Sequence, residues 1–279
     1  MPQNTPPTTR RIPGRTRLGR LRLLDRYLAL REQPLLTRRD GPWATAACAD
    51  IGMGEQAHTT AEWAAWLRGR WPGLEVLGID SEHWRVDNAR REHTGPGLRY
   101  ACASFAPSPP EPLRLVRALN LLRGYPDSEL PTAWGAMARD LLPGGLLVEG
   151  STDQPGAALG AHLLRRTDRG LEHEALLFAT DLTRGFAPAM FRGVLPHRVR
   201  ARGGHSTTAR AFLNRWTTAW EPTRSSGDPA AMFRSSVRAL ADAGEPVEAD
   251  EALLEQGLML WRAPTLARLF SLALPAGSP

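Results

Sequence analysis

Two acids and two glycines have the residue types and the spacing that most clearly point to chemistry. A short apolar run ends at Asp50, and Gly52 and Gly54 follow it with one residue between them. The next apolar run ends at Asp80. Glycines let a backbone approach a ligand closely, and a carboxylate after the second strand is placed to hold a ribose diol. The pattern predicts a site for a nucleotide-type cofactor.

The elements that must position these residues alternate between strand and helix from about Thr45. The first expected helix is marked by Thr59 and Glu62, whose spacing is typical of a helix cap. Such alternation predicts an α/β fold, a doubly wound, mostly parallel, seven-stranded sheet with helices on both faces. The expected strands are 45–50, 74–80, 98–102, 113–120, 146–149, 175–179 and 257–262, and the expected helices are 60–70, 81–91, 130–141, 209–220 and 229–242.

Charge divides the chain into a basic beginning and a near-neutral remainder. Residues 1–40 carry ten arginines against three acids, a net charge of +7, while the whole chain carries +6. We expect residues 1–17 to be a disordered basic arm and residues 18–40 to hold an N-terminal helix. The α/β domain should then cover 41–279, with its cofactor core at about 45–150 and helical additions at about 185–256. Basic arms often contact phosphate backbones, so RNA is one candidate partner.

Composition excludes several other classes of protein. All 35 basic residues are arginine, which rules out Schiff-base chemistry and a phosphate-loop lysine. No apolar run approaches the roughly 18 residues of a membrane span and no signal peptide is recognisable, so we expect a cytoplasmic protein. The seven histidines show no metal-ligand spacing, and Cys48 and Cys102 fall in expected buried strands. We expect neither a metal site nor a disulfide.

Two cofactor classes fit the glycine pair. Gly52, Gly54 and Ala57 match the G-x-G-x-x-G/A pattern of nicotinamide dinucleotide sites. Against this class, a carboxylate about 5 Å from a pyrophosphate would repel it by roughly 3 kcal/mol. In addition, a helix that begins near Thr59 starts too far from the glycines to lie under the phosphates. S-adenosylmethionine (SAM) carries an ammonium and a sulfonium, so Asp50 would attract it, and SAM is the cofactor that we expect.

The same segment resembles the class I SAM-dependent methyltransferases, whose first motif is (D/E)-x-G-x-G. Three further motifs follow in the family's order: the acid Asp80, an Asn-Leu-Leu sequence at 120–122, and an L-x-P-G-G-x-L junction at 141–147. Together the motifs cover about residues 45–150. The whole chain is most similar to a group of uncharacterised bacterial methyltransferase-like proteins, which share the arginine-rich beginning and the Thr59-Thr60 helix entry. The resemblance implies a SAM-dependent transferase.

The resemblance also implies which residues meet the cofactor. Gln56 stands where the family often has a third glycine, and Ser104 and Phe105 stand near the place of an acid that often meets the adenine amino group. Ser104 could accept one hydrogen bond there. Phe105 either covers the adenine face or belongs to the core, and the sequence leaves both open. The implied cofactor contacts are Asp50, Gly52, Met53, Gly54, Asp80, Ser104, Phe105 and Asn120.

The methyl acceptor should lie beyond the ends of the fourth and fifth strands. Methyl transfer mainly needs the two centres aligned and water excluded, with a base only if the nucleophile must lose a proton. The candidate catalytic residues are Asn120, Arg123, which could hold an acidic substrate, and Glu149, which could act as a base. We expect a small-molecule acceptor in preference to RNA. The alternatives are a non-catalytic SAM- or RNA-binding module of the same fold and, third, an NAD-dependent oxidoreductase.

Overall fold

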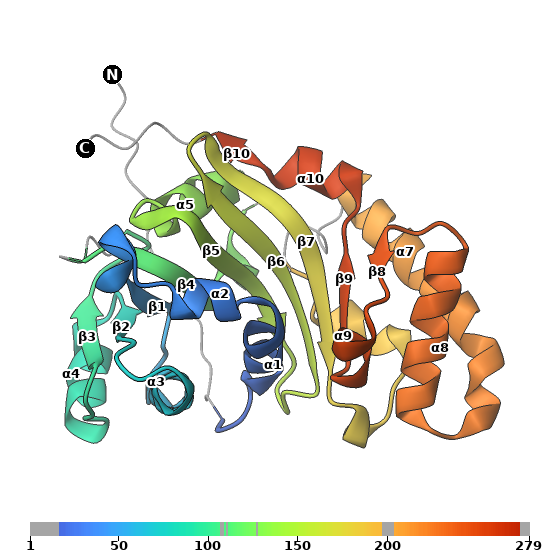
Figure 1. The fold of residues 1–279 in the computed structure, drawn as a ribbon, viewed down its shortest axis with the longest axis horizontal. Coiled ribbons are helices and arrows are strands. Elements are labelled where there is room, and N and C mark those ends of the chain that lie inside the picture. The colour runs from blue at the N-terminus through green and yellow to red at the C-terminus, as the bar shows by residue number, and fades with distance from the viewer. Residues whose placement is uncertain (1–16, 107–108, 110, 127, 197–203, 274–279) are drawn as a thin grey trace.

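One mixed sheet runs through the molecule in the computed structural model (Figure 1). The structure describes residues 17–106, 109, 111–126, 128–196 and 204–273, so nearly all of the expected basic arm lies outside it. Within these residues the sheet has ten strands in the order β3-β2-β1-β4-β5-β6-β7-β9-β8, and β10 pairs with β7. The strands are β1 (Ala47–Ile51), β2 (Val76–Asp80), β3 (Leu98–Cys102), β4 (Leu113–Leu119), β5 (Leu141–Thr152), β6 (Ala158–Thr167), β7 (Gly170–Thr180), β8 (Val247–Glu248), β9 (Leu258–Trp261) and β10 (Leu272–Ala273).

Five of these strands, β3-β2-β1-β4-β5, are parallel. Because parallel neighbours need crossover connections, helices link them: α3 (His58–Arg70), α4 (His83–Glu92) and α5 (Leu130–Met137). The predicted α/β class and the doubly wound strand order are confirmed in this half. The order reverses between β1 and β4, and such a switch point is where open α/β sheets bind ligands.

The other half of the sheet is antiparallel, from β5 through β6, β7 and β9 to β8. The expectation of seven, mostly parallel strands therefore understates the sheet, chiefly because β6 was not predicted. Alanine, glycine and arginine fill much of β6 and are weak strand formers, so its pairing comes from the neighbouring strands. The helix expected at 130–141 ends at Met137, and the Pro-Gly-Gly sequence lies inside the longer β5.

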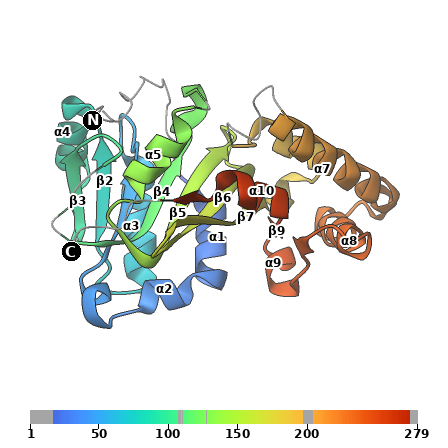
Figure 2. The ribbon, with the colours of Figure 1, turned by 90° about the horizontal axis from the view of Figure 1, so that it is seen from above.

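Helices cover both faces of the sheet (Figure 2). One face packs against α1 (Arg22–Arg31), α2 (Gln33–Thr37) and α3, and the other against α5, α7 (Gly204–Trp220) and α10 (Pro264–Phe270). The expected C-terminal helices are confirmed as α7 and α8 (Pro229–Asp242), and Asp228 caps α8 by accepting from the Ala230 and Ala231 amides. The smaller helices are η1 (Gly41–Ala44), η2 (Leu122–Gly124), η3 (Leu182–Arg184), η4 (Pro188–Gly193), η5 (Glu221–Ser226) and α9 (Glu251–Glu255).

A buried arginine joins the N-terminal helices to the sheet. Arg114 of β4 is 1% exposed, and burial lowers the pKa of its guanidinium. The guanidinium donates to the carbonyl oxygens of five residues of the N-terminal segment: Leu35, Leu36, Arg38, Trp43 and Ala46. These carbonyl groups lie at the end of α2 and around η1, where a helix has no amide of its own to pair with its last carbonyls. The segment before β1 is therefore an integral part of the domain.

Candidate functional site

The glycine loop after β1 folds back over the end of β2. The backbone is left-handed at Gly52 (φ +81°) and Gly54 (φ +77°). The amides of Gly52 and Met53 both donate to the Ile79 carbonyl, at 2.8 and 3.3 Å. A Cβ on Gly52 would come within 2.8 Å of a Leu121 methyl group, which would have to shift, and the left-handed backbone there itself favours glycine. The loop thus lies at the switch point between β1 and β4.

Asp80 ends β2 with its carboxylate turned toward this loop. It is 4% exposed and accepts from the Gly54 amide at 3.2 Å and the Glu82 amide at 3.1 Å. Arg85 of α4 places Nη1 at 3.4 and 3.3 Å from the two carboxylate oxygens. Arg85 and Asp80 thus form an ion pair that is mostly buried, so a ribose hydroxyl would have to displace Arg85 to bind the carboxylate. The sequence analysis did not predict Arg85 in this site.

Asp50, the first acid, is held in a buried ion pair. Its carboxylate accepts from Arg117 Nε at 2.9 Å, from Arg117 Nη2 at 2.6 Å and from Thr60 Oγ1 at 2.7 Å. Asp50 is 4% exposed and Arg117 is 1% exposed. The charge of Asp50 is therefore neutralised inside the protein. This removes the basis for both electrostatic expectations, the attraction for the SAM ammonium and the repulsion of a pyrophosphate, while contact between Asp50 and a cofactor stays a prediction.

The ion pair could have been anticipated from one signal in the sequence. Arg117 stands inside the apolar run Leu113–Leu119, and a charge in a fully buried strand requires either a partner of opposite charge or several hydrogen-bond acceptors. In the parallel register Arg117 lies directly beside Asp50 on the neighbouring strand. Its guanidinium also donates to the Thr59 carbonyl and lies 4.2 Å from the ring centroid of Trp63. Arg117 thus fixes the beginning of α3 over β1.

The beginning of α3 differs from the predicted cap. The helix begins at His58, its N-cap is Ala57 in a left-handed conformation (φ 48°), and no side chain caps it. Thr60 binds Asp50, and Glu62 accepts from the Gly19 amide at 2.7 Å instead of capping. The predicted Thr59–Glu62 cap is therefore wrong. The separation between the glycines and the start of the helix is nevertheless present, because a loop segment lies between Gly54 and His58.

Three of the implied contacts near the cofactor loop differ in exposure. The Met53 side chain is 2% exposed and belongs to a small core under α4. Phe105 is fully buried and packs edge to face on Tyr125, with ring centroids 5.4 Å apart, which is the core alternative that the sequence left open. Ser104 is partly exposed. If Met53 contacts a cofactor, its backbone does so.

Asn120 and Arg123 tie the end of β4 to the end of β5. Asn120 has a left-handed backbone (φ +62°), and its Oδ1 accepts from the Thr152 amide at 3.0 Å. Arg123 donates to Ser151 Oγ at 3.0 Å and to the Thr152 carbonyl at 2.7 Å. Both residues therefore lie at the edge that carries the glycine loop. The guanidinium of Arg123 is engaged by β5.

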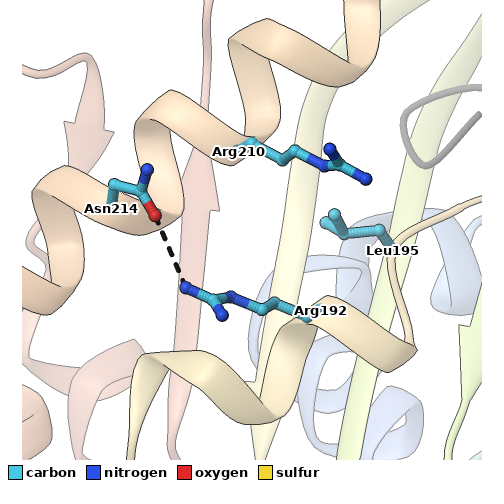
Figure 3. A pocket seen from close by; sticks show the side chains of 4 residues that line it. All are labelled: Arg192, Leu195, Arg210 and Asn214. Atoms are coloured by element: carbon cyan, nitrogen blue, oxygen red, sulfur yellow. Dashed lines mark hydrogen bonds between the residues drawn. The ribbon is translucent and has the colours of Figure 1, made fainter. Parts of the chain in front are cut away.

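A cavity opens on the α7 side of the antiparallel half, where the sequence analysis predicted no site (Figure 3). Its volume is about 340 Å³. Arg192 of η4 and Leu195 line it together with Arg210 and Asn214 of α7. Arg192 donates to Asn214 Oδ1 at 3.4 Å. These residues come from separate segments of the chain, so no local sequence pattern predicts that they lie together.

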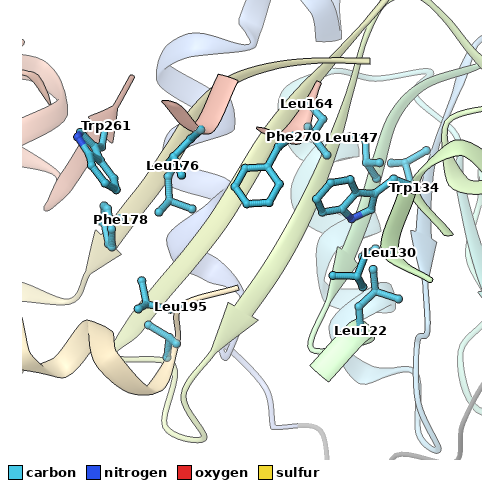
Figure 4. Packing of buried hydrophobic residues seen from close by; sticks show 14 of the residues in the cluster. Leu122, Leu130, Trp134, Leu147, Leu164, Leu176, Phe178, Leu195, Trp261 and Phe270 are labelled. Carbon is cyan, nitrogen blue, oxygen red and sulfur yellow. The ribbon is translucent and has the colours of Figure 1, made fainter. Parts of the chain in front are cut away.

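Glu149 lies in the core, one residue before Gly150, whose carbonyl accepts from the Asn120 amide at 2.8 Å. It is 3% exposed, and burial raises the pKa of its carboxyl to about 8, while the nearby Trp134 indole lowers that pKa in part. Across the β5–β6 pair it faces His162, whose Nδ1 lies 2.9 Å from His173 Nε2. Burial lowers the pKa of His173 to about 4. Trp134 and Phe270 of α10 cover this part of the sheet (Figure 4).

Within the described ranges, no three His, Cys, Asp or Glu residues are grouped so that they could hold a metal ion. No helix in the described part of the chain combines the length and the apolar character needed to cross a membrane. Cys48 is buried and Cys102 is partly exposed, and both are free thiols.

Comparison with known proteins shows likeness only at the level of structure. No protein-family model and no curated protein matches the chain. A TehB-like SAM-dependent methyltransferase from Corynebacterium glutamicum is 21% identical, with a TM-score of 0.34, over 49% of this chain and 64% of that chain. An amino pentose methyltransferase from Micromonospora echinaspora, solved with SAM bound, is 22% identical, with a TM-score of 0.34, over 57% and 71%.

Other similar structures share less of their length with this chain. A SAM-dependent methyltransferase from Mesorhizobium loti is 22% identical, with a TM-score of 0.30, over 43% of this chain and 53% of that chain. The chain spans about half the length, 46%, of a Galdieria sulphuraria structure described as a sarcosine dimethylglycine methyltransferase, at 15% identity and a TM-score of 0.34. These likenesses concern the fold, and the function has to be argued from the site.

Proposed function

We propose that this chain is a SAM-dependent methyltransferase that acts on a small-molecule acceptor. The observation that carries the proposal is the pairing of the Asp80 carboxylate with the glycine loop at the switch point of the parallel strands. A carboxylate there can accept from both ribose hydroxyls of a nucleoside cofactor. The start of α3 at His58 is set back from the glycines, so no helix N-terminus lies where a pyrophosphate would need one. That offset favours a cofactor without phosphates.

The residues at this edge would act by binding and alignment. Asp80 would hold the ribose once Arg85 moves aside, and the glycines would let the cofactor approach the backbone. Asn120, fixed by the Thr152 amide, would border the methyl group and the acceptor. SAM supplies an activated methyl group, so the protein needs mainly to orient the two centres and exclude water. Glu149 is buried too deeply to serve as a base for an acceptor at this edge.

Two alternatives share this fold. A non-catalytic SAM- or RNA-binding module would use the same edge or the basic beginning of the chain without transferring a methyl group. An NAD-dependent oxidoreductase is the third candidate, and the neutralised Asp50 no longer argues against it. The position of α3 is then the feature that separates the two cofactors.

Calorimetric titration with SAM, its demethylated product and NAD tests the proposal. We expect binding of the first two, and a preference for NAD would contradict the cofactor assignment. Asp80→Ala should weaken SAM binding by about 1.5 to 3 kcal/mol, because charge-assisted hydrogen bonds to two hydroxyls are lost. Asp87→Ala, on the exposed side of α4, is the matched control and should bind SAM like the parent.

A folding measurement must accompany this comparison. Asp80 also accepts from the Gly54 amide, so its loss could loosen the loop itself. Asp80→Asn keeps an acceptor for that amide while removing the charge. If Asp80→Asn melts like the parent and still binds SAM equally well, the ribose is not held here. An assay of methyl transfer from labelled SAM to an acceptor then distinguishes the two remaining alternatives. A methyltransferase transfers the label, and a non-catalytic binding module does not.

A further inference from the structure

The cavity between η4 and α7 has the dimensions of a small-molecule site. Its volume of about 340 Å³ lies within the range of roughly 300 to 1,000 Å³ typical of ligand pockets. Arg192 stands on one wall, Arg210 and Asn214 stand on the other, and Leu195 lies between them (Figure 3). Leu195 is buried in the core, so the floor of the cavity is fixed.

Within the described part of the chain, the two arginines of this cavity have no acidic partner, unlike the neighbouring Arg215. Among the described residues, neither Arg192 nor Arg210 forms an ion pair, and the one recorded side-chain contact of Arg192 is the long bond to Asn214. On the same helix, Arg215 is paired with Glu245. Two guanidiniums that face one cavity create a positive potential there. Guanidinium forks match the geometry of carboxylate and phosphate oxygens.

The segment that leads out of η4 connects the cavity to the part of the sheet that carries the candidate cofactor site. Asn120 bonds to Gly150 of β5, and the next residue, Ser151, pairs with Gly160 of β6. The segment after η4 crosses β6 at Gly160, where a Cβ would come within 2.7 Å of the Val194 carbonyl. Two strand spacings, about 10 Å, therefore separate Asn120 from Gly160, the point where the chain that leads out of η4 crosses β6. The arginines of the cavity stand on η4 and α7, on either side of this crossing in the sequence, so an acceptor that reaches both sites would have to be extended.

We propose that this cavity binds the carboxylate or phosphate group of the methyl acceptor. Arg192 and Arg210 would hold the anionic group, Asn214 would add a hydrogen bond, and Leu195 would contact the apolar part of the molecule. The acceptor's nucleophile would then point toward Asn120. This inference rests on the proposed methyltransferase function for the identity of the ligand, while anion binding itself does not depend on that function.

Titration with two anions, inorganic phosphate and succinate, tests the cavity directly. We expect the intact protein to bind at least one of them, and Arg192→Gln with Arg210→Gln to weaken that binding by about tenfold or more, because charge-assisted bonds are lost. The control pair is Arg215→Gln with Arg224→Gln, which removes the same charge from the neighbouring α7 and η5 surface. The control pair should bind the anion like the parent.

Each result decides the proposal. Binding of phosphate alone identifies a phosphorylated acceptor, binding of succinate alone identifies a carboxylate, and binding of both supports the shared chemistry. The proposal is contradicted if both pairs of substitutions weaken anion binding equally, or if the parent binds neither anion. A parallel SAM titration keeps the two proposals apart. Anion binding without SAM binding contradicts the methyltransferase function, and SAM binding without anion binding contradicts only the cavity.

Discussion

The arginines of the parallel strand β4 and those of the cavity beside the antiparallel half handle charge in opposite ways. In the parallel half the buried arginines are fully engaged, Arg117 by Asp50 and Arg114 by backbone carbonyls. In the antiparallel half Arg192 and Arg210 are exposed and have no acidic partner among the described residues. A buried charge must be paired, while an exposed one is free to meet a ligand. Arginines of the first half therefore stabilise the fold, and those of the cavity are available for binding.

The largest expected effect comes from breaking the buried pair. Arg117→Met leaves Asp50 buried without its partner and should lower the free energy of unfolding by about 3 to 5 kcal/mol, measured by urea denaturation. Arg192→Met, the same substitution in the other half, should change it by less than about 0.5 kcal/mol. Adding Asp50→Asn to Arg117→Met should recover part of the loss. Similar losses for the two single variants would erase the contrast between the halves.

A pH-dependent effect is expected at the boundary strand β5. Burial raises the pKa of Glu149 to about 8, so the folded protein keeps a proton that the unfolded chain releases near pH 4.5. The folded state then binds more protons between these values, and stability falls as the pH rises through this window. Glu149→Gln should therefore gain stability relative to the parent, by a few kcal/mol at pH 8 and little at pH 4.5.

Two other buried groups also make the stability depend on pH, but their contributions cancel when the parent is compared with Glu149→Gln. His173, with its pKa lowered to about 4, acts in the opposite direction, since stability rises with pH between about 4 and 6.5. Asp25, with its pKa raised to about 7, loses stability with rising pH up to that value. Both are present in the parent and in the variant, so denaturation of the pair from pH 4.5 to 8 isolates Glu149. A constant difference would contradict the assignment.

The smallest expected effect concerns the end of β4. Asn120→Ala should cost about 1 to 2 kcal/mol, because alanine disfavours the left-handed backbone and the bond to the Thr152 amide is lost. Asn120→Gly should recover the backbone part, and Asn120→Asp should retain both. Thermal unfolding of the three variants checks this order. If Asn120→Ala and Asn120→Gly lower the stability by the same amount, the left-handed backbone is not the reason that asparagine stands at this position.

Local patterns predicted the parallel half better than the antiparallel half. Each parallel strand ends in a recognisable residue or turn, so Asp50, Asp80 and the glycines could be placed at one edge from the sequence. Their partners could not be placed in this way. Arg117 and Arg85 reach the two acids through register and helix packing, and those depend on contacts far apart in the sequence. For this reason the sequence analysis expected an uncompensated negative charge at Asp50, whereas Arg117 neutralises that charge.

The antiparallel half was harder to predict because its elements are defined by pairing. β6 contains a single β-branched residue, Thr167, and no Phe, Tyr or Trp, and its hairpin neighbours supply the hydrogen bonds. The turns that bound it contain Pro155-Gly156 and Asp168-Arg169-Gly170, and these were the available signals. The cavity combines η4 and α7, so its residues share no sequence pattern. Only the three-dimensional arrangement reveals it.

The contacts of Arg114 also constrain the order in which the chain can fold. Its acceptors Leu35 and Ala46 precede it by 79 and 68 residues. During synthesis, α2 and η1 leave the ribosome well before the arginine that satisfies their carbonyls has been added. The N-terminal segment can therefore dock on the sheet only after β4 has been synthesised. This docking closes a long loop of the chain, and closing long loops slows folding. Until β4 forms, the carbonyls at the end of α2 and around η1 lack this donor, and α1 waits longer still, because it packs against β6, β7 and α9. A nascent chain stalled before residue 114 would therefore expose apolar surface and be prone to aggregate.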